Sequence, residues 1–136
     1  MPRIFGHDLI AFILAGLAFY LVGTMIYVVL FGVYWREIAN IPMEFMPAPW
    51  KMGLGFILPF IATAGLAFLY DKAGTRGMKD HVVIALVAAF AFTITAMAYG
   101  YAYGPTYNLR MLTMDGLHML LGFAAAGAVL SWRKPS

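Results

Sequence analysis

The sequence contains no cysteine. A chain without cysteine forms no disulfide, and it holds no zinc or iron–sulfur centre through thiolate ligands. Both kinds of site are therefore excluded before any motif is considered.

Charged residues are also scarce, at 11% of the 136 residues, whereas soluble domains average about 25%. Hydrophobic residues make up 63% of the chain, and the mean hydropathy is +0.83. A soluble protein of 15.0 kDa covers its surface with polar groups, and this chain has too few of them. We therefore expect the lipid bilayer to surround it. The nine Lys and Arg residues form no basic stripe with interleaved aromatic residues, so nucleic acid is not an expected partner.

Four runs without Asp, Glu, Lys or Arg approach or exceed the roughly 17–25 residues that cross a hydrocarbon core. They are Leu9–Trp35, Met52–Tyr70, Val82–Leu109 and Gly116–Trp132. Because backbone groups find no water in lipid, each run should be helical. We predict an all-α membrane protein whose residues 1–136 form a single domain, a bundle of four transmembrane helices. The expected helices cover about residues 9–35, 52–70, 82–103 and 115–132.

The charged residues that remain indicate where the helices end and how they are oriented. Asp8, Asp80 and Asp115 are expected at the starts of the first, third and fourth helices, where the helix dipole favours negative charge. With four helices, both termini and the middle connection lie on one side. That side carries six Lys and Arg residues and the other side three, which predicts that both termini are cytoplasmic. The first run, 27 residues long, exceeds the apolar core of a cleavable signal peptide, so we expect a retained anchor.

Ion-coupled transporters place carboxylates inside the membrane, but no carboxylate lies in the middle of an apolar run of this chain. This argues against ion-coupled transport. The sequence also lacks a serine nucleophile elbow, a zinc-protease motif and a phosphate-binding glycine loop. We therefore expect that the protein is not an enzyme. Pro59 should kink the second helix and free a backbone carbonyl, which leaves a small-solute channel as a third possibility.

Small residues and tyrosines mark the expected helix contacts. In the first helix, Tyr20, Tyr27 and Tyr34 recur every seven residues, and Gly16 and Gly23 share that period, which indicates one packing seam. In the fourth helix, Gly122 and Ala126 lie four residues apart and allow close approach of a neighbouring helix.

His118 is the one ionisable side chain inside an apolar run, and it shares the face of Gly122 and Ala126. We expect it to form an interhelical hydrogen bond with Asp115 or with a tyrosine of the third helix. His7 and His81 lie at the opposite surface, so His118 has no histidine at its own depth and bis-histidine haem is disfavoured. A pigment bound by His118 alone remains an alternative, because Gly122 leaves space beside it.

Methionines gather at the predicted external side, and with His118 they suit Cu(I), a soft metal ion. Six of them lie there: Met43, Met46, Met52, Met111, Met114 and Met119. The candidate metal ligands are Met43, Met46, Met111, Met114 and His118. The competing interpretation is that methionine fills space under irregular loops.

Two segments resemble a known family: GTMIYVVLFGVYWRE at Gly23–Glu37 and DGLHMLLGFAAAGAVLSW at Asp115–Trp132. They are similar to the domain-of-unknown-function family seventeen sixty-one, small bacterial inner-membrane proteins of four helices. The chain departs from the family at Met25–Val29, where the family has a Trp-Tyr-Ser-Pro run before LFG. The resemblance implies the fold and an inner-membrane location, but the family has no established activity and transfers no catalytic residue.

Our leading hypothesis is a non-catalytic membrane protein that acts as a homo-oligomer or as an accessory subunit of a larger membrane complex. Its partners would be the lipid bilayer and other membrane subunits or copies of itself, and no cofactor is needed. The rival hypothesis is a membrane protein that binds copper(I) or a pigment through His118 and the external methionines.

Overall fold

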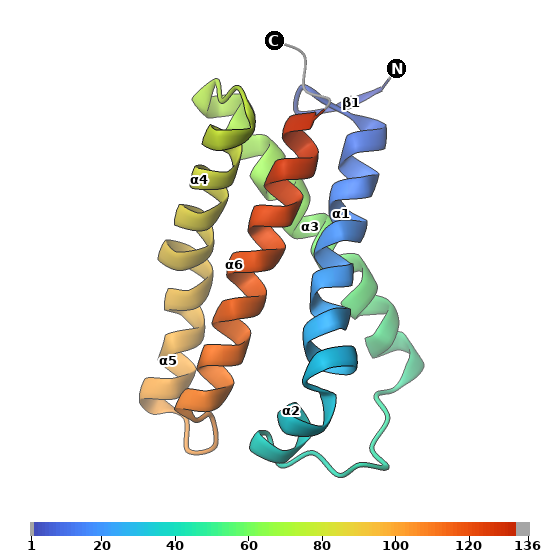
Figure 1. Ribbon diagram of the computed structural model, residues 1–136, viewed down its shortest axis with the longest axis vertical. Helices are drawn as coiled ribbons and strands as arrows, with labels where there is room; N and C mark the ends of the chain where they lie inside the picture. The colour runs from blue at the N-terminus through green and yellow to red at the C-terminus, as the bar shows by residue number, and fades with distance from the viewer. Residues whose placement is uncertain (1, 133–136) are drawn as a thin grey trace.

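The computed structural model describes residues 2–132, most of which are helical (Figure 1). A short antiparallel hairpin, β1 (Arg3–Ile4) and β2 (His7–Asp8), precedes the helices. The helical elements are α1 (Leu9–Thr24), the π-helix η1 (Met25–Leu30), α2 (Gly32–Ile38), α3 (Pro49–Ala73), α4 (Met78–Ala88), the π-helix η2 (Ala89–Ile94), α5 (Thr95–Tyr103) and α6 (Leu109–Trp132).

By length and composition, four helical stretches can cross a membrane, which confirms the predicted number of spans. They are Leu9–Leu30, Pro49–Ala73, Met78–Tyr103 and Leu109–Trp132. Their mean hydropathy ranges from 1.4 to 2.4. The connection after α2 is irregular, as its three prolines require, and Pro49 occupies the first turn of α3, where the missing N–H costs nothing.

Three helices begin earlier than predicted, because a helix can continue past a charged residue whose side chain faces water or finds hydrogen-bond partners in the protein. α3 begins at Pro49 instead of residue 52, α4 at Met78 instead of 82, and α6 at Leu109 instead of 115. The first helix is instead shorter, because it is interrupted at Phe31, with φ −126° and ψ 23°, between η1 and α2.

Two of the three aspartates stand where the helix dipole predicts them. The Asp8 carboxylate accepts the Ile10 N–H at 2.8 Å and caps α1, and Asp80 lies in the first turn of α4. The prediction that Asp115 begins the last helix is wrong. Asn108 caps that helix instead, since its side-chain oxygen accepts the Met111 N–H at 2.9 Å. Asp115 therefore lies within the span, where a carboxylate needs partners from the protein.

The central helix is α6, which packs against α1 on one side and against α4 and η2 on the other (Figure 1). α3 packs on α1, crosses behind it obliquely, and comes close to α4 at the end where the two helices are joined. The hairpin and the end of α6 lie at that same end (Figure 1). The end of the fourth helical stretch thus lies at the same end of the molecule as the start of the first (Figure 1).

Glycines in α1 and α6 set how closely the helices approach. Gly16 borders the Phe60 ring of α3, and a Cβ at Gly122 would lie 2.8 Å from the Phe19 ring of α1. A Cβ at Gly127 would lie 3.0 Å from the His81 carbonyl and would also collide with the Tyr70 hydroxyl. Because Tyr70 is buried and its hydroxyl is already hydrogen-bonded to that carbonyl, neither group has room to move.

We expect Gly127→Ala to lower the free energy of unfolding by about 1–3 kcal/mol, the usual cost of overpacking a tight contact. Thermal unfolding in mild detergent measures the effect. Gly53→Ala is the matched control, because nothing lies within 4 Å of the added Cβ on α3. Equal stability of the two variants would contradict the proposed close contact at Gly127.

Candidate functional site

Asp115 is the centre of a hydrogen-bond network in the half of the protein away from the hairpin. The Tyr27 hydroxyl donates to Oδ1 of Asp115, and the Tyr107 hydroxyl donates to Oδ2. The carboxylate thus joins three separate segments: η1, the turn between α5 and α6, and α6 itself. Hydrogen bonds to a charged acceptor are stronger than neutral ones, so this network holds these segments together.

The π-helix η1 presents Tyr27 to the network. Its wider turn is visible in the Phe31 N–H, which donates to the Ile26 carbonyl five residues earlier at 3.1 Å. The Tyr27 ring packs edge-on against Trp35 of α2, with centroids 4.8 Å apart. Single π-helical turns often occur at functional sites. This one holds the tyrosine that donates to Asp115, the only carboxylate of α6.

The turn between α5 and α6 positions Tyr107. Asn108 anchors this turn to α2, since its side-chain N–H donates to the Ile38 carbonyl at 3.0 Å. Burial is the largest effect that raises the pKa of Tyr107, and the hydrogen bond to Asp115 and the charge of Asp115 raise it further. The hydroxyl therefore stays protonated and remains a donor throughout the physiological pH range.

His118 lies one turn after Asp115 but makes a different kind of contact from the one that we expected. The ring packs edge-on against Tyr27 and Phe19, with centroids 5.1 and 5.7 Å away. A Cβ at Gly23 would lie 2.9 Å from Nε2 of His118, so only glycine leaves room for this ring. The expected interhelical hydrogen bond is absent within residues 2–132: Asp115 is bonded to the two tyrosines instead.

Two adjoining pockets border His118. The first, of about 290 Å³, lies among α1, α3 and α6, and the second, of about 460 Å³, reaches η2. Both are lined by Phe19, Gly55, Pro59 and His118. Pro59 has no N–H to donate, so the Gly55 carbonyl loses its usual helical partner beside the imidazole. The polar residues that line this largely apolar space thus include His118 and the hydroxyl-bearing Tyr20, Thr24 and Thr93.

The second pocket continues into a third, of about 430 Å³, and the two share Ala62, Thr93 and Phe123. We call these two connected pockets the α3–η2 groove. It exists because α3 crosses obliquely and approaches α4 only near the turn that joins them (Figure 1).

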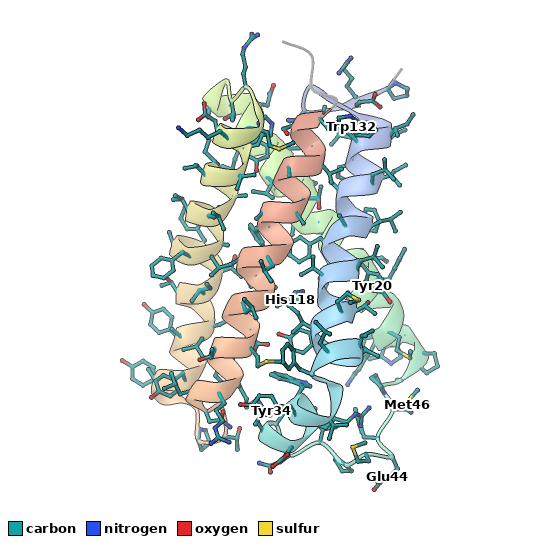
Figure 2. All side chains as sticks on the ribbon, viewed as in Figure 1. Tyr20, Tyr34, Glu44, Met46, His118 and Trp132 are labelled. Carbon is teal, nitrogen blue, oxygen red and sulfur yellow. The ribbon has the colours of Figure 1, made fainter. Side chains whose placement is uncertain are left out.

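The structure does not bring the predicted metal ligands together. Met111 and Met114 pack around Ile26 and Ile38 near the start of α6. Met43 and Met46 are 64% and 69% exposed, and Figure 2 shows Met46 well apart from His118. Within residues 2–132, no three His, Cys, Asp or Glu side chains form a potential metal site.

Two other methionines of the same half border the pockets beside His118. Met52 of α3 lines the first pocket and Met119 of α6 lines the second. Both belong to the six methionines expected at the external side, but their spacing did not distinguish them from the other four. Met52 comes to line a pocket with His118 through the packing of α3 on α1.

The predicted seven-residue seam of the first helix is divided between two neighbours. Gly16 and Tyr20 face α3, through Phe60 and Phe56, whereas Gly23 and Tyr27 face His118 of α6. Tyr34 lies beyond the break at Phe31 and is 41% exposed. The predicted small face of α6 does lie against other helices, since Gly122 meets Phe19 and Ala126 is fully buried.

The four apolar spans define a polytopic α-helical membrane protein with an aspartate–tyrosine network near the start of α6 and a groove lined by His118. The family model described as "Protein of unknown function (DUF1761)" matches residues 10–131. The chain therefore belongs to this family, which confirms the resemblance seen in the two sequence segments. No curated protein and no solved structure matches the chain.

Sequence reasoning missed Tyr107 and the central position of Asp115. The signal that was available is the Asn108 side chain, a preferred N-cap residue that stands directly before Leu109. Recognising that cap would have moved the start of the helix by about two turns and placed Asp115 inside it.

We expect Asp115→Asn to lower the free energy of unfolding by about 1.5–3 kcal/mol, because two hydrogen bonds lose their charged acceptor. Tyr107→Phe should destabilise the wild-type background more than the Asp115→Asn background, since both changes remove the same bond. Thermal unfolding of the single and double variants measures this coupling.

Tyr103→Phe is the matched control, because that side chain is 84% exposed. It should leave stability unchanged. Full additivity of the Asp115 and Tyr107 changes would argue against the network.

Proposed function

We propose that the protein is a non-catalytic, multi-pass protein of the bacterial inner membrane. It acts by packing against other membrane helices, either in a homo-oligomer or as an accessory subunit of a larger membrane complex. Both termini are cytoplasmic in this proposal, which rests on the six Lys and Arg residues of that side against three on the other.

The observation that carries the proposal is how little of two spans is buried inside the protein. Only 17% of the most apolar window is buried in Pro49–Ala73 and in Met78–Tyr103, compared with 28% in the other two spans. Every residue of α3 from Lys51 to Leu58 is exposed. These two spans therefore have large exposed apolar faces that other membrane helices can cover.

The lining of the α3–η2 groove suits a neighbouring helix better than it suits lipid tails. Its lining includes Gly55, Ala62, Gly65 and Ala88, small residues that let a helix backbone approach closely. Among the described residues, no atom lies within 4 Å of a Cβ built at Gly55 or Gly65, so no packing contact within this part of the chain requires glycine at these two positions. Lipid tails are disordered and need no such surface, whereas helix association in membranes depends on packing of this kind.

Because the chain has no cysteine, a single introduced thiol reports on its own position. Phe92 lines the groove and is 69% exposed, whereas Phe90, also on η2, is 66% exposed and does not line it. We expect Phe92→Cys to cross-link efficiently on oxidation in native membranes, and Phe90→Cys to cross-link several-fold less.

The size of the product separates the two forms of the proposal. A covalent dimer supports the homo-oligomer, and a discrete complex of fixed stoichiometry in mild detergent supports the accessory subunit. Equal cross-linking at both positions, with a monomeric purified particle, would overturn the proposal.

A second candidate function is the binding of copper(I) or a pigment at His118. The observation that favours it is that the imidazole borders two pockets, one lined by Met52 and the other by Met119. A thioether and an imidazole together suit Cu(I), and the pocket volumes leave space for an apolar ligand.

If this second function is correct, the purified protein should take up one equivalent of Cu(I) or show a visible absorption band. His118→Phe should weaken copper binding at least tenfold in a competition titration with a Cu(I) chelator. Met46→Leu, in the exposed loop, is the control that should bind as the wild type does. A colourless preparation that takes up no Cu(I) would exclude this function.

A further inference from the structure

His7 and His81 form a buried pair at the opposite end of the molecule from the Asp115 network. His7 lies in β2 and His81 in the first turn of α4, and both side chains are 0% exposed. Their Nε2 atoms are 3.2 Å apart, a hydrogen-bond distance. The pair joins the hairpin to α4 across 74 residues of sequence.

The other nitrogen of each ring faces a backbone carbonyl. Nδ1 of His7 lies 3.0 Å from the Phe5 oxygen, and Nδ1 of His81 lies 2.8 Å from the Gly77 oxygen. A carbonyl oxygen only accepts hydrogen bonds, so each Nδ1 must carry a proton to form its bond.

These three hydrogen bonds determine how many protons the pair holds. A neutral imidazole carries one ring proton, and both rings place it on Nδ1. Two neutral rings would then direct two Nε2 lone pairs at each other. Moving one proton from Nδ1 to Nε2 restores the central bond but leaves that Nδ1 lone pair facing a carbonyl. Only a pair with one additional proton forms all three bonds.

We propose that His7 and His81 bind one proton between them, as an imidazolium whose Nε2–H donates to the Nε2 of a neutral imidazole. No bond of the chain is made or broken, and the proton comes from water. The bound proton strengthens the contact between the hairpin and α4, because only with it are the central hydrogen bond and both Nδ1 hydrogen bonds made at the same time.

The surroundings accommodate one positive charge. The Tyr70 ring lies against His81, with centroids 4.1 Å apart, and 5.8 Å from His7, which allows a cation–π attraction. The carbonyls of Phe5 and Gly77 point their negative ends at the two rings. The N-terminal dipole of α4 disfavours positive charge on His81, so the charge resides mainly on His7.

Among residues 2–132, the other charged and titratable groups of the elements around the pair are bonded to further groups or lie on the surface. The Tyr70 hydroxyl donates to the His81 carbonyl at 2.7 Å, the Asp8 carboxylate caps α1, and Arg3 donates to the Gly6 carbonyl at 3.1 Å. The exposed charged groups of the adjoining elements are Asp71, Lys72, Arg76, Lys79 and Asp80.

The proposal predicts a pH optimum for the contact between hairpin and α4. When the pair loses its proton at higher pH, either two Nε2 lone pairs face each other or one Nδ1 lone pair faces a carbonyl. When it gains a second proton at lower pH, two N–H groups and two positive charges face each other. Each change removes at least one of the three hydrogen bonds, so the hairpin is held best at intermediate pH.

Nitrogen-15 NMR of histidine-labelled full-length protein in lipid nanodiscs tests the proton count directly. At the pH of greatest stability we expect three protons on the four ring nitrogens of His7 and His81, with both Nδ1 atoms protonated. Two protons on the four nitrogens at that pH, or one equivalent of metal bound to the pair by elemental analysis, would overturn the proposal.

A variant series tests the pH optimum independently. His7→Gln offers an amide in place of the ring and removes the need for an added proton, so the variation of Tm between pH 5 and 9 should fall at least threefold. His118→Gln is the matched control and should keep the wild-type profile. An unchanged profile in His7→Gln would count against the proposal, and if that variant does not fold, the NMR measurement on the wild type decides.

Discussion

Polar groups inside a bilayer must find their hydrogen-bond partners within the protein, because lipid offers none. The described part of the chain meets this requirement in two ways. Threonine hydroxyls bond within their own helix, as when Thr63 donates to the Pro59 carbonyl at 2.7 Å. Tyrosine hydroxyls reach other segments, as when Tyr70 of α3 donates to the His81 carbonyl of α4 at 2.7 Å and two tyrosines donate to Asp115 of α6. The second kind of bond joins the spans to one another.

The interhelical bonds lie toward the two ends of the molecule, and between them the helices meet through apolar and small residues. Phe19 illustrates this middle zone, since its ring packs against Gly122, Phe123 and His118 of α6. Such contacts depend on shape alone, so one methyl group in the wrong place is enough to separate two helices. The ends specify which segments meet, and the middle sets how closely they approach.

The same division explains how much of the candidate site was predictable. Gly122 and Ala126 were correctly expected at a helix contact, because small residues four apart on one helix are a local pattern. His118 was correctly placed beside them, but its partners were not. Asp115 drew both tyrosines, since a charged acceptor competes for donors better than a neutral ring does.

The sequence by itself determined the class of the protein: four helices long and apolar enough to cross a membrane, membership in one family, and helix contacts at Gly16, Gly23 and Gly122. These follow from composition and from periodicity along single helices, which are local properties. Only the tertiary structure decided that His7 meets His81 and that Tyr27 and Tyr107 meet at Asp115. His7 and His81 are 74 positions apart, and Asp115 is 88 positions from Tyr27 and 8 from Tyr107. They come together through the relative rotation and crossing of the packed helices and the path of the turns. No periodic pattern along one helix records that rotation, because the side chains of both partners set it jointly.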